Sequence, residues 1–190
     1  MEQASQIDRD IGGRVRVLRE QTGLTLDELA ARSRVSRAML SRIERGESSP
    51  TAQLLGRVCG GLGVTLAALF AAAERPAAPL ARRGDQPVWR DPGSGYLRRA
   101  VSPAGTGSLA DITEIEFPAG ASVSFDNHRL SGDQHVWVLD GALEMQVDEE
   151  TFRLETGDCL HMRFGGPVVF RNPTRRMTRY AVIVCHGTRA

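Results

Sequence analysis

Basic side chains gather in one short stretch of this sequence. Residues 30–45 hold five arginines and a single acid, a net charge of +5 − 1 = +4, whereas the whole chain carries only +1. A guanidinium forms paired hydrogen bonds with a phosphate or with the edge of a guanine in the major groove. These residues therefore predict contact with DNA, and charge alone leaves open a solvated charged face. The polar side of the stretch consists of Ser36, Arg37, Ser41, Arg42 and Arg45.

A second group of polar side chains lies in the last third of the chain. Cys159, His161 and Arg163 alternate with apolar residues, so on a β-strand all three share one face. If that face points inward, the three side chains line a pocket suited to a small anionic or polar ligand. If it points outward, they are surface residues. Periodicity does not decide between the two, and the same ambiguity applies to His128 and Gln134.

Two short helices must position the basic stretch. Thr25 is a good N-cap, and Glu28 three residues later completes a capping box, so we expect a first helix over Leu26–Ser33. Ser36 caps a second helix, whose narrow apolar stripe is Leu40 and Ile43 and which Gly46 ends. Helices this short need packing partners. A short helix with a buried apolar side and a basic outer side is how a helix-turn-helix presents its recognition helix.

The segment from Leu24 to Phe70 resembles the Xre-type, phage-repressor-like helix-turn-helix domain. The similarity covers about residues 11–70, and its most specific part is SRIERGESSPT. The family usually has Gln at the start of its second helix, where this chain has Leu26. The resemblance implies binding to a double-stranded DNA operator. It implies groove-facing positions at Ser36, Arg37, Ala38, Ser41 and Arg42, and a backbone contact at Arg45.

Further helices complete this first domain. Ile11, Val15 and Leu18 recur at i, i+4, i+7 and predict an amphipathic helix over residues 8–22. We expect a fourth helix from Pro50 to Gly63, and a short fifth helix from Thr65 to Leu69. After residue 70 the composition shifts to Ala, Pro, Arg and Gly, which indicates a linker over residues 71–87.

Composition limits the class of protein. A chain of 190 residues with 41% hydrophobic and 25% charged residues suits one or two globular domains. No apolar run approaches the roughly 18 residues of a membrane span, and the N-terminus has no signal-like apolar region. The three cysteines show no paired spacing, so we expect reduced thiols and a cytoplasmic location. A redox pair of Cys159 and Cys185 is the alternative.

From residue 88 onward the sequence reads as short β-strands between turns. Such regular spacing is typical of a β-sandwich or barrel. The expected strands are Tyr96–Val101, Leu109–Phe117, Ser122–Phe125, His135–Leu139, Leu143–Val147, Thr151–Leu154, Cys159–Arg163, Val168–Arg171 and Arg179–Cys185.

The segment HVWVLDGALEMQVDEETFRLETGDCL resembles a cupin, a small jelly-roll β-barrel, with the similarity spanning about residues 88–186. Catalytic cupins usually bind a metal through three His and one Glu. Here Gln134 stands at the Glu position, Val168 stands at the third His position, and the paired His positions fall near Asn127 and Arg129, on either side of His128. Glutamine is a poor transition-metal ligand and valine is none. We therefore expect no metal, no cofactor and no catalytic residues.

The sequence as a whole predicts an α + β multidomain protein. A five-helix helix-turn-helix domain (residues 8–70) is joined by the linker (71–87) to a cupin jelly-roll barrel (88–190). Proteins resembling this arrangement are bacterial transcription regulators, so we expect DNA binding, homodimerisation and a small-molecule effector. The pocket candidates are His128, Gln134, His161 and Arg163. The alternatives are a metal-dependent cupin isomerase or dioxygenase with an accessory DNA-binding domain, and a structural or antitoxin-like DNA-binding protein with an unliganded cupin.

Overall fold

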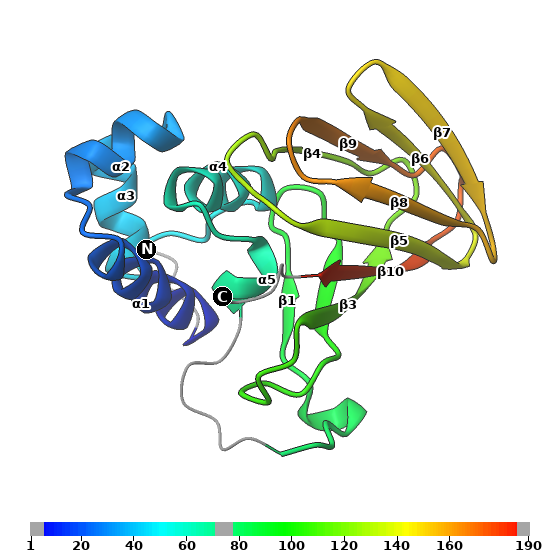
Figure 1. Cartoon of the computed structure of the whole chain (residues 1–190), viewed down its shortest axis with the longest axis horizontal. Helices are drawn as coiled ribbons and strands as arrows, with labels where there is room; N and C mark the ends of the chain where they lie inside the picture. The colour runs from blue at the N-terminus through cyan, green and yellow to red at the C-terminus, as the bar shows by residue number, and fades with distance from the viewer. Residues whose placement is uncertain (1–5, 71–77, 186–190) are drawn as a thin grey trace. The chain divides into compact units, whose positions relative to one another are not determined.

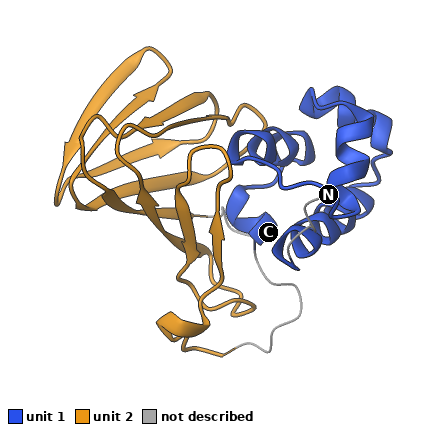
Figure 2. Ribbon diagram, turned by 180° about the vertical axis from the view of Figure 1, so that it is seen from behind, with its two compact units in different colours: residues 1–70 blue, residues 71–190 orange. Residues whose placement is uncertain are grey.

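Ten strands follow five helices along this chain, in a computed structural model that describes residues 6–70 and 78–185 (Figure 1). The chain divides into two compact units, residues 1–70 and 71–190 (Figure 2). Each unit has its own core and is described separately below. None of the described helices has the length and apolar content that crossing a bilayer requires.

Over its described residues, 6–70, the first unit contains helices and short connections and no strand, as the sequence predicts. Hydrophobic residues spaced by three or four positions fill its core, and they come from every helix. Leu29, Leu40 and Leu55 are completely buried at its centre. The helices are α1 (Gln6–Gln21), α2 (Leu26–Ser33), α3 (Arg37–Glu44), α4 (Ala52–Leu62) and α5 (Leu66–Phe70).

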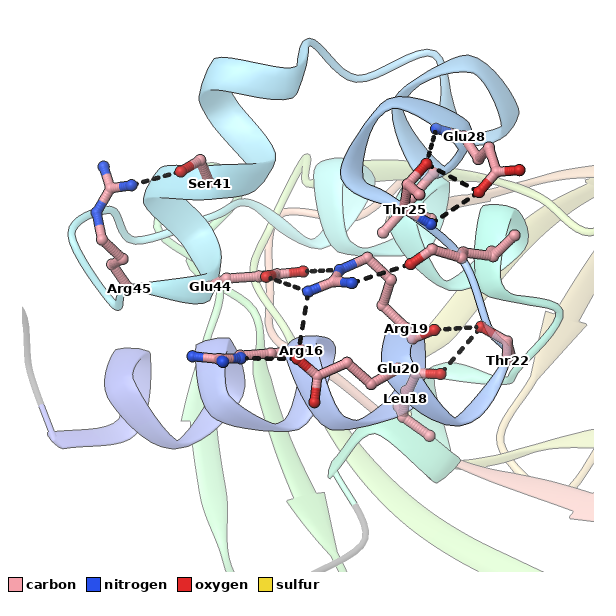
Figure 3. Close-up of polar contacts among 12 residues, drawn as sticks. Arg16, Leu18, Arg19, Glu20, Thr22, Thr25, Glu28, Ser41, Glu44 and Arg45 are labelled. Carbon is pink, nitrogen blue, oxygen red and sulfur yellow. Dashed lines mark hydrogen bonds and ion pairs between the residues drawn. The ribbon is translucent and has the colours of Figure 1, made fainter.

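The ends of these helices are fixed by side-chain caps. The predicted capping box of α2 is confirmed: the Glu28 amide donates to Thr25 Oγ1, and the Thr25 amide donates to a Glu28 carboxylate oxygen (Figure 3). Thr51 caps α4 through the Leu54 amide, and Gly63 ends it in the left-handed conformation at φ 72°. Local sequence therefore sets where each helix begins and ends.

Close packing joins α1 to the C-terminal end of α3. A β-carbon at Gly12 would lie 2.1 Å from the Ile43 carbonyl oxygen, so only glycine permits this approach. The sequence predicted the inward stripe of α1, but it gave no signal for this contact between helices.

The second unit consists of two facing antiparallel sheets. The larger sheet has the order β1-β2-β3-β10-β5-β8, and the smaller has the order β4-β9-β6-β7. The strands are β1 (Val88–Arg90), β2 (Leu97–Ala100), β3 (Ala110–Phe117), β4 (Ser122–Asp126), β5 (Asp133–Asp140), β6 (Ala142–Val147), β7 (Glu150–Glu155), β8 (Cys159–Arg163), β9 (Pro167–Arg171) and β10 (Thr178–Cys185). All nine predicted strands are present within a residue or two of their expected ends. Strand β1 was not predicted, because its three residues give too short a pattern.

Aromatic side chains fill the space between the two sheets. Trp89, Tyr96, Phe117, Tyr180 and Phe170 form a continuous series in which neighbouring ring centroids lie 5.9–6.0 Å apart. Such edge-to-face and stacked pairs add stability beyond the burial of area. This series joins strands that are far apart in the chain into one core.

Part of the predicted linker is ordered against the larger sheet. Residues 71–77 lie outside the described residues, but a short 3-10 turn, Arg83–Asp85, follows them. The side chain of Glu114 on β3, only 9% exposed, accepts hydrogen bonds from Arg83 Nη1 at 3.0 Å and from Arg179 Nη2 at 2.8 Å. Burial raises the pKa of Glu114, but the bonds from Arg179 and Arg83 outweigh burial and the net pKa is lowered.

Replacing Glu114 with glutamine should remove an acid-dependent part of the stability of the second unit. A carboxylate with a lowered folded-state pKa contributes stability above its unfolded pKa of about 4.3, and that stability is lost as the pH falls through the folded value. At neutral pH the substitution should lower the free energy of unfolding by about 1–3 kcal/mol. Chemical denaturation at pH 7 and below pH 4 tests this. An equal loss at both pH values would contradict the assignment.

Candidate nucleic-acid interface

Helix α3 presents the polar side that the sequence predicts. Its apolar side chains Leu40 and Ile43 are buried at 0% and 1% exposure, which fixes the rotation of the helix against the rest of the unit. The opposite side is therefore turned to solvent. Ser41 is half-buried, and the exposed residues on that side are Ser36, Arg37, Ala38, Arg42 and Arg45.

The connection between α2 and α3 is short and defined. Arg34 adopts the left-handed conformation at φ 54°, which few residues other than glycine favour, and it turns the chain out of α2. Val35 is buried, and Ser36 then caps α3 by accepting a hydrogen bond from the Met39 amide at 3.3 Å. The N-terminal end of α3 is thereby left exposed with its polar residues.

An ion pair beneath α3 holds its C-terminal end. Arg19 on α1 donates from Nε to Glu44 Oε1 at 2.7 Å and from Nη2 to Glu44 Oε2 at 3.0 Å (Figure 3). The same guanidinium donates from Nη1 to the Leu24 carbonyl oxygen at 2.9 Å. The two side chains are only 13% and 8% exposed, and the bond to Glu44 is the main cause that raises the pKa of Arg19. A single side chain thus ties α1, the loop before α2 and the end of α3 together.

Acidic groups accompany the exposed arginines. Arg37 Nε lies 3.1 Å from Asp27 Oδ1 on α2. Arg45 pairs with Glu47 at 2.7 Å and also donates to the Ser41 hydroxyl, and the Glu47 carboxylate is the main cause that raises the pKa of Arg45. These ion pairs are solvent-exposed, so DNA phosphates and bases can replace the carboxylates as partners.

The structure separates the four pocket candidates in the second unit. The side chains of His128, His161 and Arg163 are 61%, 51% and 85% exposed. Only Gln134 points inward, where its amide donates to Met162 Sδ at 2.7 Å. The interpretation of the four as one pocket is therefore corrected: on β8 it is the apolar set that faces the core.

The two cysteines proposed as a redox pair lie too far apart to bond within one chain. Cys159 is opposite Trp137 on β5, whereas Cys185 is opposite Asp133 on the other side of the same strand. Four residues along the strand and two strand spacings separate them by about 16 Å, well beyond disulfide reach.

Sequence patterns missed the polar groups that do lie between the sheets. Arg98, Thr113 and Tyr180 are 7%, 3% and 4% exposed, and Arg98 Nη2 donates to Thr113 Oγ1 at 2.9 Å. Burial raises the pKa of the Tyr180 hydroxyl well above its usual value. Arg98 follows Leu97 and precedes Arg99, so no alternation marked it as inward-facing.

The expected metal-ligand positions are occupied by residues with other roles. Val168 is 2% exposed within the core, and Asn127 is 9% exposed in the loop between β4 and β5. Among residues 6–70 and 78–185, no group of three or more His, Cys, Asp or Glu side chains has the geometry to hold a metal ion.

Two family models match this chain. A helix-turn-helix model matches residues 15–69, and a cupin domain model matches residues 113–184. The first match covers α2, α3 and α4 with the caps described above, and the second covers most of the two facing sheets.

Known proteins are similar to this chain over most of its length. The HTH-type transcriptional regulator SutR of Escherichia coli (strain K12) is 30% identical over 155 residues, which are 82% of this chain and 83% of SutR. The crystal structure of an HTH_3 family transcriptional regulator from Vibrio cholerae is 26% identical, with a TM-score of 0.77 over 95% of this chain and 97% of that one. The crystal structure of FeII HppE is 16% identical, with a TM-score of 0.50 over 93% of this chain and 98% of the HppE chain. This similarity shows a shared fold and nothing more.

Replacing Glu44 with alanine should destabilise the helical unit strongly. The substitution removes both hydrogen bonds between the poorly exposed Arg19 guanidinium and Glu44, although Leu24 and, at 3.6 Å, Glu20 remain as partners. Loss of hydrogen bonds to a charged group typically costs about 1.5–3 kcal/mol. Denaturation followed by the helical circular dichroism signal measures this. Asp10→Ala is the matched control, because Asp10 is an exposed acid on the same helix as Arg19 that accepts a hydrogen bond from Gln6, and it should leave the unfolding midpoint unchanged. Equal midpoints for the two variants would contradict the role of the Arg19–Glu44 pair.

Proposed function

Since this chain belongs to the HTH-type transcriptional regulators and carries a helix-turn-helix and a cupin domain, we propose that it binds an operator as a homodimer controlled by a small effector. The DNA-binding domain spans residues 8–70 and the cupin domain spans residues 88–190, joined by residues 71–87. The protein acts where DNA is accessible, in the cytoplasm. The observation that carries the DNA-binding proposal is the exposed arginine face of α3, held outward by its buried apolar side.

We assign base reading to Arg37, the first residue of α3, and to Arg42, five positions later on the same exposed side. In a helix-turn-helix the first residues of the recognition helix reach base edges in the major groove. Arg37 and Arg42 are exposed and can each form paired hydrogen bonds with guanine. Arg45 follows the helix end and is assigned a phosphate. The remaining groove-facing positions are Ser36, Ala38 and Ser41.

The homodimer uses the outer face of the larger sheet. We call this surface, made by Ile112, His135, Trp137, His161 and Ile183, the outer sheet face. Ile112, Ile183, His135 and His161 form one row across four neighbouring strands, and Trp137 is 47% exposed beside it.

The sequence and the charges on β10 and β5 support a second copy of this chain as the partner of the outer sheet face. An antiparallel strand with one solvated face alternates apolar with polar residues, but on the outer side of β10 the exposed Arg179 is followed by the apolar Ala181 and Ile183, of which Ile183 is half-buried. Asp133 lies 3.6 Å from both His161 and Arg163 at the end of this face. In two copies related by a twofold axis, Asp133 of one copy can therefore lie against His161 or Arg163 of the other.

The cupin domain binds an effector rather than catalysing a reaction. Gln134 and Val168 stand where a catalytic cupin needs metal ligands, and neither supplies a carboxylate or an imidazole. The interior polar groups Arg98, Thr113 and Tyr180 favour a ligand with hydrogen-bonding or anionic groups. The effector changes the affinity for DNA if it binds the DNA-competent arrangement of the dimer more tightly or more weakly than the other arrangement. The coupling free energy between the two sites is typically about 1–3 kcal/mol.

Alanine substitutions should separate base readers from phosphate contacts. Arg37→Ala and Arg42→Ala should each weaken the cognate site by about 1–3 kcal/mol and relax the preference at one base pair. Arg45→Ala should weaken all sequences equally and make the salt dependence shallower. Binding of the full chain to a randomised site library at several salt concentrations measures both effects. Arg153→Ala, which removes an 85%-exposed arginine from the other unit, controls for lost charge. Unchanged preferences in both Arg37→Ala and Arg42→Ala would defeat the assignment.

Trp137→Arg should convert the dimer to a monomer, because it places a charge within the outer sheet face. The dissociation constant measured by sedimentation should rise at least about tenfold, as expected for loss of an aromatic anchor. Met177→Arg is the matched control, since Met177 is similarly exposed at 48% but lies outside this face. If both variants sediment like the parent protein, a different surface holds the dimer.

A further inference from the structure

Asp27 and Arg37 form an ion pair between the two helices of the DNA-binding motif. Asp27 lies in the first turn of α2 and Arg37 is the first residue of α3, ten positions later in the chain. Arg37 Nε lies 3.1 Å from Asp27 Oδ1. The pair therefore depends on the packing of α2 against α3, whereas Arg45 and Glu47 pair within one short segment.

Stability does not account for this pair. The two side chains are 65% and 76% exposed, and exposed ion pairs contribute little to folding. Asp27 does have a local role as an acid in the first turn of α2, where negative charge is favourable. That role does not require the Arg37 guanidinium, which extends from the N-terminal end of α3.

The position of Arg37 makes an acidic neighbour useful. The N-terminal end of a helix carries partial positive charge, so a cation in the first turn of α3 is disfavoured there. A carboxylate on the facing helix offsets this repulsion and engages Nε. The two Nη atoms, which form the paired contact with guanine O6 and N7, stay available to a base. The ion pair with Asp27 thus biases the position of the long side chain and leaves its recognition edge free.

We propose that Asp27 is a positioning residue that sets the sequence preference of Arg37. Its negative charge also repels nearby phosphates, so it lowers affinity for DNA of any sequence while it sharpens the choice of base. Specificity is the difference between the affinities for the correct and the incorrect DNA sequences. A repulsive group lowers both affinities, and it increases the difference when the contact with the correct base offsets the repulsion. This inference rests on the proposed function, because it requires Arg37 to read a base.

Asp27→Asn tests the proposal in the full-length protein. The substitution keeps the size of the side chain and removes its charge. Against a randomised site library, the preference at the base pair read by Arg37 should fall roughly fivefold, a fraction of the discrimination of one paired contact. Affinity for non-specific DNA should rise. Asp10→Asn, which neutralises an exposed acid on α1, is the control and should leave the preference unchanged.

A double substitution separates the two assignments. In the Arg37→Ala background, Asp27→Asn should cause no further loss of preference, because its only route to the base has been removed. If Arg37→Ala relaxes the preference but Asp27→Asn behaves like Asp10→Asn, the positioning role is wrong and base reading by Arg37 stands. If Arg37→Ala leaves every preference intact, the proposed function at this residue fails and this inference with it. A lower melting temperature for Asp27→Asn with intact preferences would show a structural role and overturn the proposal.

Discussion

The poorly exposed ion pair between Arg19 and Glu44 is the interaction on which the DNA-binding unit depends. Glu44 ends α3, and the arginine that holds it also binds the Leu24 carbonyl at the loop before α2. A buried guanidinium needs a partner for almost every donor, so this arrangement permits only a narrow range of positions for α3. The exposed arginines of α3 are held in a fixed orientation because their helix is anchored from beneath.

A different constraint organises the second unit. One face of each strand packs against the other sheet, and the opposite face is turned outward. Aromatic rings fill the interior, and the few polar groups among them are hydrogen-bonded or strongly shifted in pKa, as Arg98 and Tyr180 show. The outer side of the larger sheet combines apolar with ionisable residues, including the His135–His161 pair at 4.9 Å between ring centroids. These two features, polar groups in the interior and a mixed outer side, are the ones from which we propose effector binding and dimerisation.

Charge is used differently on the two helices of the motif. Basic residues on and directly after α3 supply attraction to DNA, and the acids Asp27 and Glu47 pair with Arg37 and Arg45. Exposed ion pairs of this kind contribute little to stability and are easily exchanged, so DNA can replace the acids as partners of these arginines. On the proposal made above, the balance between general attraction to DNA and sequence preference depends on how acids and arginines are paired.

Local signals in the sequence determined the helices, their caps and nearly all strands. Thr25 with Glu28, Ser36, Thr51 and Gly63 act through contacts within a few residues, so spacing alone predicts them. Spacing could not reveal the Gly12 contact with Ile43, nor which side of β8 is inward, because both depend on residues distant in the chain. His161 and Arg163 therefore looked like pocket residues, and Arg98 did not. Alternation shows that a strand has two faces, but only the packing of one sheet on the other decides which face is buried.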